Sequence, residues 1–148
     1  MENIKKDKEK KPLMLGGVSL GVFLLIMAVV TGVNNYLKSL PPSASEIAST
    51  VDEVKSKITI PMKIDSAMTL VDITAEPNAI RFHYTISNEV NTDNLTNSYI
   101  KNYLVSNVCK NPDVRNFLDR GIKIEYYSVT EDKLKSFFTT LTKADCLN

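Results

Sequence analysis

The sequence lacks the motifs by which many small enzymes are recognised. It has one histidine, His83, and it contains no glycine-rich phosphate loop, no His-Glu-x-x-His motif and no Gly-x-Ser-x-Gly motif. A catalytic histidine works beside a nucleophile or an orienting carboxylate, and no residue pattern identifies such a partner for His83. We therefore expect a non-enzymatic protein without a cofactor or a metal, in which His83 lies on the surface of a strand.

Cysteine is also scarce, and the two that are present are Cys109 and Cys146. Redox pairs usually have Cys-x-x-Cys spacing and zinc sites need four close ligands, and neither pattern occurs here. Because no cysteine precedes Cys109, we expect no lipoprotein anchor at the N-terminus. An even number of cysteines in an oxidising compartment predicts one structural disulfide.

Positive charge is not in excess, because 18 basic side chains face 17 acidic ones. The first 12 residues hold five lysines and three acidic residues, whereas the residues after position 33 are close to neutral. Proteins that bind nucleic acid displace counterions with clustered Lys and Arg, and the C-terminal part has no such cluster. We expect no nucleic-acid partner.

One stretch, Leu13 to Val33, contains no charged residue at all. As a helix it covers about 31 Å, the thickness of the hydrocarbon core of a bilayer. Its lysine-rich N-terminal flank is expected to stay in the cytoplasm. The stretch therefore predicts a single-pass protein of the bacterial inner membrane with a periplasmic C-terminal domain. A cleaved secretory signal is the alternative, but such signals have shorter apolar runs, and the best small-residue site, near Ser43, lies well beyond this one.

Small residues form a stripe along this predicted membrane helix. At 100° per residue they lie on one face, and the first two have the spacing of the close-approach motif of helix pairs in lipid. The alternative is that glycine is simply common in membrane helices. We take the stripe as a candidate surface for helix association in a homodimer; its residues are Gly17, Gly21, Ala28 and Gly32.

The whole chain divides into four parts: a cytoplasmic basic tail at 1–12, a transmembrane helix at 13–36, a linker and stalk helix at 37–60 and a periplasmic domain at 61–148. The helix is expected at 46–58, where apolar residues recur at spacings of four and three after the capping residue Ser45. Such a helix can extend as a stalk or pack on the domain, and its apolar residues do not decide between the two.

Strand patterns and helix patterns alternate after Pro61. Two strands are predicted first, at 67–76 and 80–86. Two helices are predicted next: one is capped by Thr92 or Asp93 and runs to about Val108, and a short one at 112–118 is ended by Gly121. Two further strands are predicted to begin at Ile122 and Leu134. The order β-β-α-α-β-β predicts an α+β domain with a four-stranded antiparallel sheet whose helices cover one face.

Adjacent aromatic residues occur on both of the last two predicted strands, as Tyr126-Tyr127 and Phe137-Phe138. Successive side chains of a strand face opposite sides, so one residue of each couple must point away from the core. We take Tyr127, Phe137 and Phe138 as a candidate partner surface. The alternative is a second core, formed by packing of the stalk helix on that face.

The C-terminal half resembles a known family. The segment Cys109-Lys-Asn-Pro-Asp-Val-Arg-Asn-Phe-Leu-Asp-Arg-Gly121, the strand with Tyr126 and Tyr127, and Asp145-Cys146 resemble the AspS-type pilotins of type II secretion. The resemblance covers about 68–146, and it implies a small disulfide-tied α+β domain that binds a short secretin tail. Pilotins work as outer-membrane lipoproteins, and this chain departs from them in having no N-terminal cysteine.

These observations predict an inner-membrane-anchored, periplasmic protein-interaction protein with an accessory, assembly or exclusion role. Its expected partner is another cell-envelope protein. The alternative function is that of a periplasmic ligand-binding or minor enzymatic domain that uses the exposed sheet face around His83. A deep polar cleft beside His83 would favour that alternative, and a flat or grooved apolar edge would favour partner binding.

Overall fold

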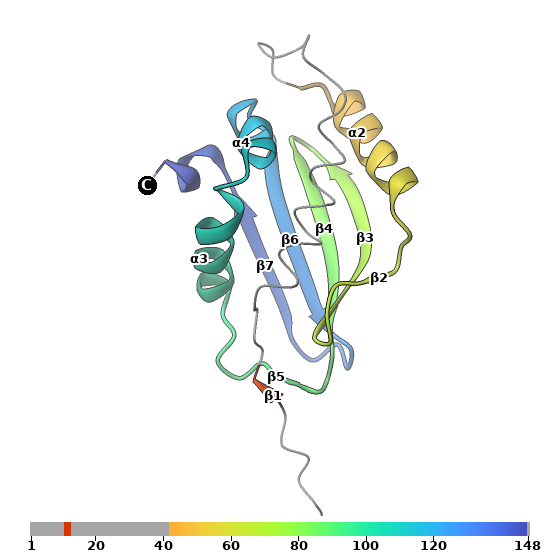
Figure 1. Ribbon diagram of the computed structural model, residues 1–148, viewed down its shortest axis with the longest axis vertical. Coiled ribbons are helices and arrows are strands. Elements are labelled where there is room, and N and C mark those ends of the chain that lie inside the picture. Colours follow the sequence, from red (N-terminus) through yellow and green to blue (C-terminus); the bar gives the residue numbers. More distant parts are fainter. Residues whose placement is uncertain (1–10, 13–41, 148) are drawn as a thin grey trace, which may run out of the picture.

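The computed structural model describes residues 11–12 and 42–147 (Figure 1). The predicted membrane span and its small-residue stripe lie outside the described residues. Within those ranges, no helix combines the length and the apolar character needed to cross a membrane. The elements are β1 (Lys11–Pro12), α2 (Ala44–Lys57), β2 (Met62–Lys63), β3 (Met68–Glu76), β4 (Ala79–Ile86), β5 (Val90–Asn91), α3 (Asn97–Val108), α4 (Pro112–Asp119), β6 (Lys123–Thr130), β7 (Ser136–Leu141) and the 3-10 helix η1 (Lys143–Cys146).

The main sheet has five strands in the order β2-β3-β4-β6-β7. The α+β class is confirmed, but the expected four-stranded antiparallel sheet is wrong in two respects. First, β4 and β6 are parallel, because the long connection through α3 and α4 returns the chain to the starting end of the sheet before β6 begins. Second, β2 adds an edge strand opposite Thr69 and Leu70. A strand of two residues shows no alternation from which it could have been predicted.

All three α-helices pack against one face of the sheet. A single cluster of buried side chains joins apolar residues of α2, α3 and α4 to those of the strands, among them Ile47, Val54, Val108, Leu118 and Ile124. Helix α2 contacts β3 and β4, α3 lies along β7, and α4 contacts β6 (Figure 1). Of the two arrangements that the sequence left open, α2 therefore packs on the domain.

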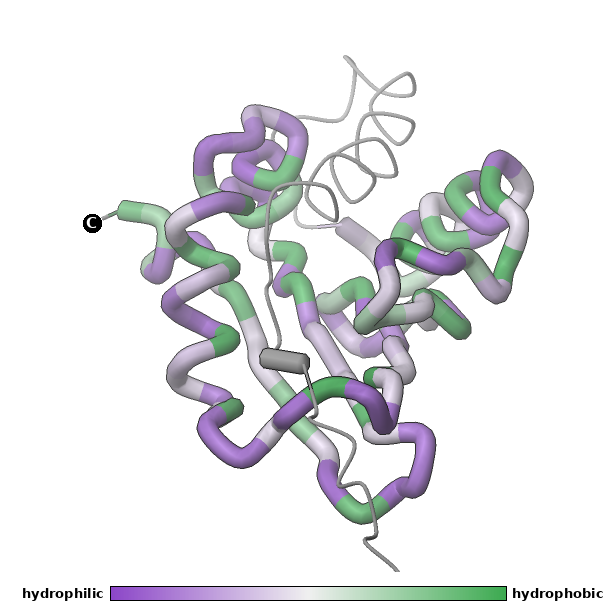
Figure 2. Tube along the Cα trace, turned by 60° about the horizontal axis from the view of Figure 1, so that its bottom comes forward, coloured by the Kyte–Doolittle hydropathy of each residue, from purple (hydrophilic) through white to green (hydrophobic). Residues whose placement is uncertain are grey.

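The hydropathy of the trace follows this layering. Figure 2 shows hydrophobic positions recurring along the helices and strands, whereas the loops at the ends of the molecule are mostly hydrophilic. Strand β4 illustrates the cause: Ile80, Phe82, Tyr84 and Ile86 are buried, and the residues between them are only partly covered. An alternating strand presents one apolar face to the helices and one polar face to solvent.

The helix starts are set by short polar side chains that cap free backbone N–H groups. Ser43, rather than the predicted Ser45, caps α2 by accepting a hydrogen bond of 3.2 Å from the N–H of Glu46. Thr96, rather than the predicted Thr92 or Asp93, caps α3 by accepting from the N–H of Tyr99 at 3.1 Å. The helix begins late because the N–H of Asp93 is already bonded to the Asn91 side chain at 2.9 Å, in a turn that precedes it.

Gly121 ends α4, as the sequence predicted. Its φ is +84°, a left-handed conformation that a residue with a Cβ rarely adopts. The N–H of Gly121 donates to the carbonyl of Leu118, and the N–H of Ile122 donates to that of Phe117, both at 3.0 Å. This pair of bonds is the Schellman motif, and it turns the chain directly into β6.

Side chains cover the backbone at both edges of the sheet. At the β3 edge, Nζ of Lys55 donates to the carbonyl of Ile73 at 3.3 Å and to the Asp72 carboxylate at 2.7 Å. At the β7 edge, the N–H of Phe138 donates to the side-chain oxygen of Asn97 at 3.1 Å, and the Thr139 hydroxyl donates to the Asn97 carbonyl at 3.3 Å. Strand β7 at one edge, and β3 beyond the two residues of β2 at the other, are thus each bonded to a helix residue.

Candidate functional site

The candidate site is the sheet face opposite the helices, which we call the open face. The strand register aligns two rows of side chains across β3, β4, β6 and β7 on this side. The first row is Asp72, His83, Tyr127 and Phe138, and the second is Thr74, Arg81, Glu125 and Thr140. None of these eight side chains belongs to the buried clusters formed by the described residues.

Two aromatic side chains lie side by side on the open face. Tyr127 and Phe138 are directly paired between β6 and β7, and they are 36% and 43% exposed. Their chain neighbours Tyr126 and Phe137 point the other way and are buried. Phe137 was expected to join the candidate partner surface, and that expectation is wrong, because the alternation of β7 directs it into the core beside Ile86.

A charged group holds one side of this aromatic pair in place. The Arg81 guanidinium bonds to the Glu125 carboxylate at 2.8 Å and lies 3.3 Å from that of Glu76. Its carbon also sits 5.4 Å from the ring centre of Phe138, within the range of a cation–π contact. Arg81 is therefore fixed by two carboxylates while one side of it supports the exposed ring.

His83 occupies the middle of the first row. Its Nε2 is 2.9 Å from the Thr74 hydroxyl, which donates to the Glu76 carboxylate, and its ring meets Tyr127 edge-on at 5.8 Å. Partial burial, aided by the charge of Arg81, lowers the pKa of His83 against the opposing effect of Asp72. A lowered pKa keeps this histidine neutral near pH 7. His83 is thus a half-buried, hydrogen-bonded histidine on the polar side of β4, the side on which the sequence places it.

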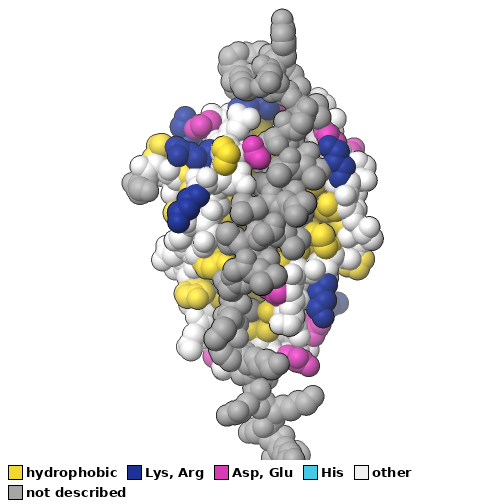
Figure 3. All heavy atoms as spheres, in the orientation of Figure 1, with side chains coloured by type: hydrophobic (Ala, Val, Ile, Leu, Met, Phe, Trp, Pro, Cys, Tyr) yellow, Lys and Arg dark blue, Asp and Glu magenta, His cyan; other side chains and the backbone are white. Residues whose placement is uncertain are grey.

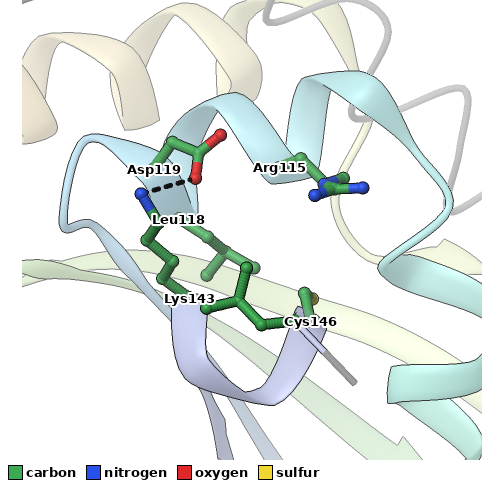
Figure 4. A pocket seen from close by; sticks show the side chains of 6 residues that line it. Arg115, Leu118, Asp119, Lys143 and Cys146 are labelled. Atoms are coloured by element: carbon green, nitrogen blue, oxygen red, sulfur yellow. Dashed lines mark ion pairs between the residues drawn. The ribbon is translucent and has the colours of Figure 1, made fainter.

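A small pocket lies at the disulfide, away from the open face. It is lined by side chains of α4 and of the C-terminal segment, and the ion pair between Lys143 and Asp119, 3.1 Å long, closes one side (Figure 4). Its free space of about 10 Å³ holds no more than about one water molecule. Within residues 11–12 and 42–147, no cluster of three or more His, Cys, Asp or Glu side chains could hold a metal ion.

The disulfide ties the end of the chain to the helix layer. Cys109, the C-cap residue of α3, is bonded to Cys146 in η1, with the two Cα atoms 5.3 Å apart. Next to it, the Asp145 carboxylate accepts hydrogen bonds of 2.8 Å from the backbone and hydroxyl of Thr142 and pairs with Lys101 of α3 at 2.8 Å. Burial alone would raise the pKa of Asp145, but these partners together lower it.

Sequence reasoning found part of this site. It identified His83, Tyr127 and Phe138 by their position in alternating strands, but it missed Arg81 and Glu125. Their opposite charges are visible in the sequence, yet 44 residues separate them, and only the parallel register of β4 and β6 brings them together.

Solved structures with the same fold come from secreted and secretion-related proteins. A Pseudomonas aeruginosa protein described as secreted matches with a TM-score of 0.60 and 17% identity, over 76% of this chain and 99% of its own. EpsS, the pilotin of the Vibrio vulnificus type 2 secretion system, matches with a TM-score of 0.55 and 16% identity, over 69% of this chain and 89% of its own. The type II secretion pilotin AspS of Vibrio cholerae gives 0.52 and 16%, over 68% and 88%.

The resemblance to AspS-type pilotins is thus confirmed at the level of the fold. No protein-family model matches the chain, and no relative is found among characterised protein sequences.

Proposed function

We propose that this chain is a non-enzymatic protein-interaction module of the bacterial cell envelope with an accessory role in secretion. The observation that carries the proposal is the exposed pair Tyr127 and Phe138, presented on a sheet face that none of the described helices covers. The shared fold supports it, because two proteins with this fold are pilotins of type II secretion systems.

The open face has the composition of a binding surface. Aromatic residues and arginine are enriched where protein partners meet, and they contribute most of the binding free energy. Arg81 is held by Glu125 and Glu76 before any partner arrives, so little side-chain entropy is lost when it is covered. The partner that fits is a protein segment with apolar side chains for the two rings and an acceptor group near Arg81.

We also propose the location. In this proposal the charge-free segment 13–33 anchors the chain in the inner membrane, with the lysine-rich tail in the cytoplasm and the domain in the periplasm. The stripe Gly17, Gly21, Ala28 and Gly32 would then allow two anchors to pack. With such an anchor the partner is an envelope protein within reach of the inner membrane, and the secretin-piloting role of the lipoprotein pilotins does not follow from the shared fold.

The test places a photo-crosslinking amino acid at Tyr127, at Phe138 or at Tyr99 in the full-length protein in cells. Tyr99 is the matched control, because it is 51% exposed but lies on α3. We expect the same envelope protein to be captured from positions 127 and 138 and not from position 99. Phe138→Ala should reduce that capture from position 127 about tenfold, as truncation of an interface hot spot does.

Tyr99→Ala should leave capture from position 127 unchanged. Equal capture from all three positions, or capture from position 127 that survives Phe138→Ala, would show that the open face is not the binding surface. Circular dichroism of each variant shows whether the domain is still folded.

A further inference from the structure

The N-terminal segment is paired with the domain at β5. Lys11 and Pro12 form a two-stranded parallel sheet with Val90 and Asn91, apart from the five-stranded sheet. Strand β5 is itself held firmly, because the Val90 side chain is buried beside Ile86 and Phe137. Figure 1 shows β1 and β5 together at the end of the domain opposite the N-terminal end of α2.

The surroundings of β5 complement a basic segment. Glu89 and Asp93 flank the strand, and the turn between β6 and β7 adds Glu131 and Asp132. That turn is bonded to the segment before β5, because the N–H of Asn88 donates to Glu131 at 3.1 Å and the N–H of Asp132 donates to the Asn88 side chain at 3.2 Å.

Acidic side chains are visible at this end of the molecule in Figure 3. Four carboxylates thus stand near β5 against two local lysines, Lys133 and Lys135, and the Asp93 carboxylate is paired with Lys135 at 2.9 Å. The first 11 residues carry five lysines, namely Lys5, Lys6, Lys8, Lys10 and Lys11. A basic segment paired along β5 would be attracted by these carboxylates, and the attraction would weaken as salt shortens the screening length.

The pairing of β1 with β5 sets a condition on the intervening chain. Pro12 is paired with Asn91 of the domain, and Pro42, at the other end of the interval, is buried at the start of α2. Both ends of the interval 13–41 are therefore attached to the same domain. A chain that crossed the bilayer once within that interval would place its two ends on opposite sides of a hydrocarbon core about 30 Å thick. Strand pairing needs backbones about 5 Å apart, so the two arrangements cannot coexist in one molecule.

We propose that β5 and its acidic surroundings form a docking site for the chain's own basic N-terminal segment. The docked form is a form of the protein in which segment 13–33 does not span the membrane. Insertion of that segment requires β1 to leave β5. The docking site lies outside the open face and does not depend on the function proposed for that face.

The test is a disulfide cross-link in the full-length protein, made in cells. Pro12→Cys with Asn91→Cys places two thiols at paired positions, and Asn91 is exposed. Pro12→Cys with Ser45→Cys is the matched control, because Ser45 is also exposed but lies in the first turn of α2, at the opposite end of the domain. After mild oxidation, we expect a cross-link within one chain for the first pair and none for the control, since only close, oriented cysteines can be bridged. Peptide mapping verifies that Cys109 and Cys146 remain bonded to each other.

Fractionation tests the second half of the proposal. Alkaline carbonate should release the cross-linked chain from membranes, whereas the uncross-linked chain should stay in the pellet. Failure of the first pair to cross-link in a folded chain overturns the docking site. Cross-links formed only between two chains would make a second copy the occupant and overturn docking within one chain. A cross-linked species that stays in the carbonate-treated pellet would show that β1 can pair with β5 while segment 13–33 is inserted in the membrane, and would overturn the claim that the two arrangements cannot coexist.

Discussion

The disulfide between Cys109 and Cys146 is expected to provide a large share of the stability of the domain. It closes a loop with a sequence separation of 37. In the chain-entropy treatment, cross-linking a loop of this length removes roughly 13 cal/mol/K from the unfolded ensemble, which corresponds to about 4 kcal/mol at 25 °C. Domains of this size have a free energy of unfolding of about 5–15 kcal/mol. The double variant Cys109→Ser/Cys146→Ser should therefore still fold at low temperature, but with a much smaller free energy of unfolding.

Pulse proteolysis in urea measures this loss in the full-length protein. With a denaturant slope of about 2 kcal/mol/M, a loss of about 4 kcal/mol lowers the urea midpoint by about 2 M. Reduced wild-type protein is the control, and its midpoint should coincide with that of the double variant. A midpoint that falls by less than about 0.5 M, or a reduced wild type that stays well above the variant, would refute the loop-closure reasoning.

Three further predictions concern single positions. Gly121→Ala should cost about 1–2 kcal/mol of unfolding free energy, because its φ of +84° is unfavourable for a residue with a Cβ. Nothing lies within 4 Å of the added methyl group, so the cost comes from the backbone alone, and an unchanged urea midpoint would contradict this cause. Leu70→Ala, at a fully buried position, should cost about 2–5 kcal/mol in the same measurement. The folded pKa of His83 lies below its ordinary value of 6.5, so the unfolded chain binds more protons at this residue. The free energy of unfolding should therefore decrease as pH drops through 6.5, and this decrease should be smaller in His83→Gln.

The last prediction concerns the cluster beside the disulfide. The folded pKa of Asp145 lies below 3.8, so the stability that this carboxylate contributes is present above that pH and is lost as pH falls through the folded value. Lys101→Met removes one of the groups that lower this pKa, and NMR titration should show it moving upwards. A titration curve that does not move would assign the lowering to the Thr142 hydrogen bonds alone.

The sequence predicted the elements of this fold better than their pairing. The alternation of β4 and β6 and the stop at Gly121 depend on neighbouring residues, and these predictions agree with the structure. The parallel pairing of β4 with β6 depends on where a connection of more than 35 residues returns the chain, and no local pattern encodes that. The same limit explains the site: Tyr127 and Phe138 were found by alternation, whereas the Arg81–Glu125 contact exists only through the register.

The covered edges of the main sheet have a consequence for how this protein can assemble. Exposed edge strands invite other chains to add strands, and proteins suppress this with short edge strands and with side chains that occupy the edge. Lys55 does so at β3, Asn97 does so at β7, and β2 is only two residues long. Edge-to-edge growth of the sheet into fibres is thereby disfavoured on both sides. Association with this domain is consequently directed away from strand addition to the main sheet and towards side-chain contacts such as those that Tyr127 and Phe138 offer on the open face.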